Sequence, residues 1–165
     1  MTGNVFSRLS EVMKEVEAIG KNQTNQAQRF KFRGIDDVYN TLHPLFSKHG
    51  LVMAPKVHSA SYKKRQSNNG GLLTLARLLV SYTIYAPDGS SVEVGPVAGE
   101  AMDSGDKASN KALAVAHKYA LLQLLLVPTN DPENDPDASS HAPQYNAPKS
   151  RVNEVANKLN PQRKY

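Results

Sequence analysis

The sequence predicts an α+β fold: N-terminal helices, then a three-stranded antiparallel meander, then one long helix. Three observations predict it. Apolar residues recur every three or four positions near the N-terminus, strict alternation marks 72–86, and a mostly apolar stretch runs from Ser104 to Pro128. Turn signals at 67–71 and 86–89 separate the expected strands, which favours antiparallel pairing.

Two helices are expected before the sheet. The first covers 5–19, where the apolar side chains form one narrow stripe. The second is capped by Asp36 or Asp37 at its start. Pro44 should kink it or start a new turn, and Gly50 is placed to end it.

The strongest strand signal lies in the middle of the chain. Within 72–86, one face carries five apolar side chains: Ala76, Leu78, Val80, Tyr82 and Ile84. Residues 51–65 alternate more loosely and form the strand before it. Val92, Val94 and Pro96 mark a third strand whose side chains face inward. Together these segments make the meander.

The long helix is expected over Ser104–Leu126. Ser104 is a good N-cap, Asp103 is a rival cap, and Pro128 closes the helix. Most of its positions are apolar or small, so it must be buried on several sides, by its own sheet and by a neighbouring subunit. At 100° per residue its three lysines fall within about 40° of one another. They are Lys107, Lys111 and Lys118.

Composition excludes several classes of function. The chain of 165 residues has no cysteine, which excludes disulfides, thiolate metal sites and thiol catalysis. It has no Walker-type phosphate loop, so we expect no ATP and no other cofactor. No apolar run is long enough to cross a bilayer, and no signal peptide is evident, so a cytoplasmic protein is expected. The net charge of +5 favours a polyanionic partner.

One alternative is a metal-dependent nuclease. Glu100, Asp103 and Asp106 lie near the junction between the last strand and the long helix, where carboxylates could hold Mg²⁺. Helix capping explains the same residues without a metal. The histidines show no metal-ligand spacing. We therefore expect no catalytic residue and no metal site.

Nucleic-acid binding accounts for more of the sequence. After a polar segment at 20–29, typical of a flexible connector, Lys31 and Arg33 alternate with Phe30 and Phe32, whose rings either stack on bases or pack in the core. A basic triplet, Lys63, Lys64 and Arg65, is expected at a hairpin tip, as a phosphate clamp or a solvated turn. The lysine row on the long helix is the most informative element. Its like charges repel unless a polyanion lies along it. We expect the row to stay exposed and to face a common channel.

Four stretches also resemble a known family: Phe30–Asn40, Leu42–Leu45, Gly99–Ala108 with Lys111-Ala112, and Lys118–Leu121 with Pro128-Thr129. They resemble the essential recombination function (Erf) family of bacteriophage single-strand annealing proteins, over about residues 4–130. The resemblance implies ATP-independent annealing of complementary single strands during homologous recombination or DNA repair in the bacterial host cell. It also implies a β-β-β-α core that forms oligomeric rings or helical filaments, with DNA in an outer basic groove.

The expected organisation is an annealing core at 1–130 and an acidic, proline-rich disordered tail at 131–165 that includes one weak helix. A single-strand binding protein is the candidate partner of this tail. Besides the nuclease, two alternatives stay open: a protein that coats single strands without annealing them, and an adaptor whose tail recruits a host protein while the core only oligomerises.

Overall fold

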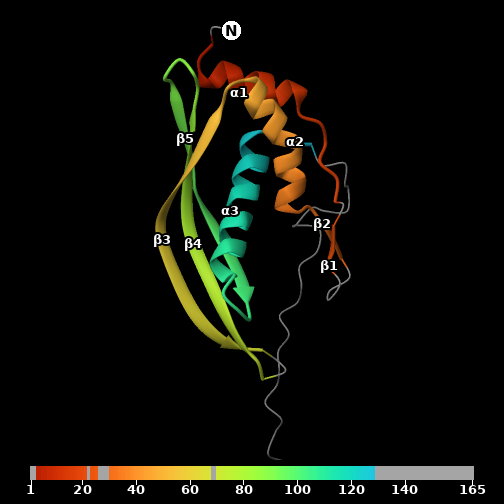
Figure 1. Ribbon diagram of the computed structural model, residues 1–165, viewed down its shortest axis with the longest axis vertical. Helices are drawn as coiled ribbons and strands as arrows, with labels where there is room; N and C mark the ends of the chain where they lie inside the picture. Colours follow the sequence, from red (N-terminus) through yellow and green to blue (C-terminus); the bar gives the residue numbers. More distant parts are fainter. Residues whose placement is uncertain (1–2, 22, 26–29, 68–69, 129–165) are drawn as a thin grey trace, which may run out of the picture. The chain divides into compact units, whose positions relative to one another are not determined.

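The computed structural model describes residues 3–21, 23–25, 30–67 and 70–128, and confirms the α+β class (Figure 1). The predicted tail at 131–165, with its short helix, lies outside the described residues. The elements in chain order are α1 Val5–Glu15, β1 Gln23–Asn25, β2 Phe30–Phe32, α2 Ile35–Lys48, β3 Val52–Gln66, β4 Leu72–Tyr85, β5 Ser91–Asp103 and α3 Ala108–Leu124.

The predicted meander is a three-stranded antiparallel sheet in the order β3-β4-β5. Its register places Ala76 of β4 between Tyr62 of β3 and Ala101 of β5. Gly70 and Gly89 have positive φ angles in the two turns that connect the strands, a conformation that glycine adopts without steric cost. The alternation predicted for β4 is confirmed, because its apolar face packs in the core.

One predicted position on β5 is wrong. Two residues, Gly95 and Pro96, lie opposite the single Ser81 where the register shifts. This bulge reverses the alternation of the strand. Pro96 is therefore exposed, and Val97 takes the inward position next to Val80. A bulge has no period of its own, so alternation alone could not place it.

Helix α3 lies against the sheet, with α2 beside it (Figure 1). It faces β4 with a stripe of small residues that are at most 4% exposed: Ala108, Ala112, Ala116 and Ala120. Small side chains allow the helix backbone to approach the strands closely. One such close approach is at Gly99 of β5, where an added Cβ would lie 2.2 Å from the carbonyl oxygen of Ala112.

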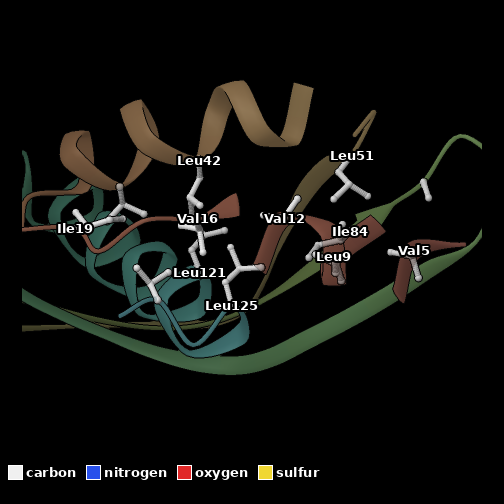
Figure 2. Close-up of a cluster of buried hydrophobic side chains, with 13 residues drawn as sticks. Val5, Leu9, Val12, Val16, Ile19, Leu42, Leu51, Ile84, Leu121 and Leu125 are labelled. Carbon is white, nitrogen blue, oxygen red and sulfur yellow. The ribbon is translucent and has the colours of Figure 1, made fainter. Parts of the chain in front are cut away.

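A second apolar cluster joins α1, α2 and the C-terminal half of α3 (Figure 2). Asn4 caps α1 by accepting from the Ser7 amide at 3.1 Å. The helix ends at Glu15, earlier than the predicted 5–19. Val16 and Ile19 are still buried in this cluster, although they follow the end of the helix. Their apolar spacing therefore reflects burial and not helical structure.

The predicted connector at 20–29 is partly wrong. Gln23–Asn25 forms β1, which pairs antiparallel with β2. Its side chains are polar, so no alternation distinguished this strand from a loop. The N-cap of α2 is Gly34 and not Asp36 or Asp37, although Asp37 accepts from the Gly34 amide at 2.9 Å. Pro44 starts no new turn and lies inside the helix Ile35–Lys48. Gly50 ends α2 as predicted, with a positive φ and the Leu51 amide donating to the carbonyl of Phe46.

The start of α3 also differs from the prediction. The helix begins at Ala108 rather than at Ser104, and its N-cap is Lys107. The rival cap, Asp103, organises the turn: its Oδ1 accepts from the amides of Gly105 at 2.8 Å and Lys107 at 3.3 Å. Residues 104–106 form the bend that this carboxylate holds. The lysine row therefore starts at the first turn of α3.

Candidate nucleic-acid interface

The predicted row begins with two exposed lysines on α3. Lys107 and Lys111 are exposed, but Lys111 forms an ion pair with Asp103 at the end of β5. The Lys111 hydrogen bond is the largest cause that lowers the pKa of the Asp103 carboxyl to about 2, and the Gly105 amide adds to it. Lys111 is therefore exposed, as expected, but its ammonium group is paired within its own subunit. The contact links a strand end to the first turns of a helix, which spacing within the helix could not predict.

Lys118, the last member of the row, lies beside Arg33. The expectation that the row stays exposed is wrong at Lys118, which is half-buried and whose Nζ donates to the carbonyl oxygen of Arg33 at 3.1 Å. The same Nζ lies 4.9 Å from the centre of the Tyr119 ring. Burial, and then the charge of Arg33, lower the pKa of the Lys118 ammonium. Among the described residues, neither cation has a carboxylate within ion-pairing distance.

The guanidinium group of Arg33 is held by the backbone of the segment that follows α1. Its Nε donates to the carbonyl oxygen of Ile19, while its buried Nη2 has no hydrogen-bond partner within the described part of the chain. Two cationic residues therefore come from the segment before α2 and from the middle of α3, and the charge of Arg33 acts on the Lys118 ammonium. Repulsion between like charges costs stability unless an anion offsets it.

The basic triplet is not a single clamp. Lys63, Lys64 and Arg65 lie within β3 rather than at the hairpin tip, so their side chains alternate between the two faces of the sheet. Lys64 shares the α3 face and donates to Thr74 Oγ1 at 2.9 Å. Thr74 pairs with Asp103 across the strands, so Lys64 lies near the start of the lysine row. Lys63 and Arg65 belong to the opposite face.

The aromatic and basic segment of β2 is described in part. Its backbone pairs with β1, and Phe32 is half-buried. The side chains of Phe30 and Lys31 lie outside the described part of the structure. The choice between base stacking and core packing therefore stays open for Phe30, and Lys31 stays a prediction.

The carboxylates of the nuclease alternative are not brought together. Glu100 pairs with Arg77 on the face of the sheet that points away from α3, whereas Asp103 points toward α3 and pairs with Lys111. Asp106 is exposed in the bend before the helix. In the described ranges, no three side chains of His, Asp or Glu form a cluster that could hold a metal ion. The geometry does not support the alternative of a metal site built from these three carboxylates.

Sequence reasoning missed an aromatic cluster between α3, the sheet and α2. His117 stacks on Tyr82, with ring centres 4.7 Å apart, and shares a 2.6 Å hydrogen bond between its Nδ1 and the Tyr39 hydroxyl. Burial lowers the pKa of His117 and raises the pKa of Tyr82 to about 12. These rings come from α2, β4 and α3, so no local motif joins them.

A cavity of about 340 Å³ opens beside this cluster. Residues that line it come from α2, β3, β4 and α3: Tyr39, Pro55, Tyr82, Asn110, Ala114 and His117. The Tyr82 side chain is 2% exposed, and its hydroxyl has no hydrogen-bond partner among the described residues. Asn110 and Ala114 lie on α3 between members of the lysine row. The cavity therefore adjoins the basic face.

The ion pair at Lys111 gives a testable prediction. Asp103→Asn keeps the Oδ1 acceptor for the turn but removes the charge that occupies Lys111. We expect a few-fold gain in affinity for a polyanionic strand and a salt slope steeper by about 0.7, the value of one added phosphate contact on single strands. Fluorescence anisotropy with an oligothymidylate over a range of salt concentrations measures both.

The matched control is Asp106→Asn, which removes the same charge from the same bend. Asp106 is exposed and has no ion pair among the described residues. Equal gains in the two variants would mean that net charge, and not the release of Lys111, sets the affinity.

Asp103→Asn should also remove the contribution that the Asp103 carboxylate makes to the free energy of unfolding. Because folding lowers the pKa of Asp103, this contribution is present above pH 3.8 and is lost as the pH falls toward about 2.

Comparison with known proteins identifies the family of the chain. No curated protein matches the chain. Among the described residues, no helix is both long enough and apolar enough to span a membrane. A family model described as the ERF superfamily matches residues 5–164, which is nearly the whole chain and contains every motif on which the resemblance rested. The chain therefore belongs to the ERF superfamily.

Proposed function

We propose that this protein binds single-stranded DNA along the exposed face of α3 and anneals complementary strands without ATP. Membership of the ERF superfamily supports a role in recombination or annealing. The observation that carries the proposal is Lys118, whose ammonium group donates to the backbone carbonyl of Arg33 and which, like Arg33, has no carboxylate partner among the described residues. A phosphate that contacts this ammonium group offsets the repulsion from the nearby Arg33 and releases counterions.

The other cations of this face extend the phosphate track. Lys107 and Lys111 lie on the turns of α3 that precede Lys118, and Lys64 adjoins them from β3. These side chains recognise a backbone and not base edges, so they do not read sequence. An annealing protein needs this property, because it must hold any strand and leave the bases free to find their complements.

Assembly of several copies belongs to the same proposal. Strand β3 is an edge strand of its sheet, and apolar side chains on it are exposed: Val52 by 64%, Val57 by 49% and Tyr62 by 58%. An edge strand presents unpaired amide and carbonyl groups, and exposed apolar side chains add to its tendency to associate. Repeating one modest site around an oligomer multiplies the affinity through effective concentration.

The test is an annealing assay with two labelled complementary oligonucleotides, without ATP, in the presence and absence of Mg²⁺. The proposal predicts duplex formed faster than by the oligonucleotides alone, with Mg²⁺ not required. A bound strand without duplex would identify a coating protein, and shortened strands that appear only with Mg²⁺ would identify a nuclease. Either result would contradict the proposal. Light scattering of the full chain measures whether the active species is an oligomer.

A further inference from the structure

We propose that the 340 Å³ cavity between α2, the sheet and α3 takes one unpaired nucleobase of the bound strand. This inference rests on the proposed function and adds a base site to its phosphate track. The lysines alone bind the phosphates of single and double strands alike. Preference for a single strand needs a contact that a paired base cannot make, and a cavity that encloses one base supplies it.

The chemistry of the lining suits a base. Tyr39 is 41% exposed and presents an aromatic ring, while Pro55 and Ala114 add apolar surface. A base is a flat ring with polar edges, so it gains from stacking on aromatic side chains whatever its identity. The volume of the cavity lies within the range of small-molecule sites, although a base fills only part of it.

Asn110 supplies a polar group for the edge of a base. It lines the cavity and is exposed on α3, and its amide both donates and accepts. Such an amide can bond to any base. Tyr82 belongs to the wall of the cavity, where its ring stacks on His117 and its hydroxyl is buried, so the contact with the base falls to Asn110 and the Tyr39 ring.

The position of the cavity fits a base attached to a bound backbone. Asn110 comes three residues after Lys107, and Ala114 lies three residues after Lys111 and four before Lys118. Residues at these spacings are neighbours on a helix surface. A strand whose phosphates follow the lysine row therefore passes the mouth of the cavity. A base held there leaves the cavity when it pairs with its complement, so duplex formation releases the strand.

The experiment compares an intact oligonucleotide with one whose bases are removed at intervals, using the full chain. For the wild-type protein, we expect the abasic strand to bind about fivefold more weakly or worse, the value of one lost stacking contact. Ala114→Leu fills the cavity with a good helix former and leaves every lysine in place. This variant should bind both strands equally, as weakly as the wild type binds the abasic strand, with an unchanged salt slope.

Asn110→Ala tests the polar contact, and Gln123→Ala is its matched control, because Gln123 is an exposed amide on α3 that does not line the cavity. Equal binding of intact and abasic strands by the wild type would overturn the base site while the phosphate track stands. An Ala114→Leu variant that still distinguishes the two strands would overturn it as well. Failure of the wild type to bind any single strand would instead refute the proposed function, and the base site with it.

Discussion

Replacing Lys111 and Lys118 together by alanine is expected to weaken binding to single-stranded DNA by about tenfold at moderate salt and to reduce the salt slope by roughly one to two units. Each ammonium that contacts a phosphate releases counterions, and the loss of two such contacts sets the size of the effect. Lys118 should contribute more than Lys111, because Lys111 is already paired with Asp103, whereas Lys118 has Arg33 beside it.

The control removes the same charge elsewhere. Lys14 lies on α1 in a surface pair with Glu11, and Lys56 is exposed on the face of β3 that points away from α3. The variant Lys14→Ala with Lys56→Ala should retain most of the affinity and nearly all of the salt slope. Circular dichroism must show that both double variants are folded, because Lys118 also bonds to the Arg33 carbonyl. Equal losses in the two variants would refute a defined phosphate track.

The periodic elements of the fold could be predicted from the sequence, and the physical reason is burial on one face. β4 is the central strand, so its apolar face must pack against α3, and the alternation records this directly. The helical spacing of the buried alanines of α3 likewise reflects the packing of one helix face against the sheet. β1 escaped prediction because its pairing with β2 involves polar residues, for which burial imposes no pattern.

The candidate site was predictable only where it follows a single helix. The spacing of Lys107, Lys111 and Lys118 is enough to place them on one face, because helical geometry alone fixes their directions. Contacts between elements could not be derived in this way: the Asp103–Lys111 pair joins a strand to a helix, and the cavity draws residues from four elements. The turn lies at 67–71 as predicted, but the basic triplet was misplaced, because β3 continues up to that turn and puts the three side chains on alternate faces of the strand.

Gly99→Ala is expected to destabilise the protein by about 3 kcal/mol or more, the upper range for inserting an atom into a packed core. The new Cβ would lie 2.2 Å from the carbonyl oxygen of Ala112 and 2.9 Å from the Cβ of Ala116. The nearest atom belongs to the backbone of α3, so no side-chain rotation relieves the contact and the helix must move away from the sheet. A loss of this size is a large share of the stability of an ordinary domain.

Urea denaturation followed by circular dichroism measures this loss. Gly105→Ala is the matched control, because Gly105 is exposed and its added Cβ meets only the Asp103 carboxylate at 3.3 Å, so the midpoint should change little. Ala116→Gly should not rescue Gly99→Ala, since it removes a side chain and leaves the Ala112 carbonyl in place. A Gly99→Ala midpoint equal to that of the wild type would show that α3 does not pack this closely on β5. The lysine row would then lack the rigid support that a continuous phosphate track requires.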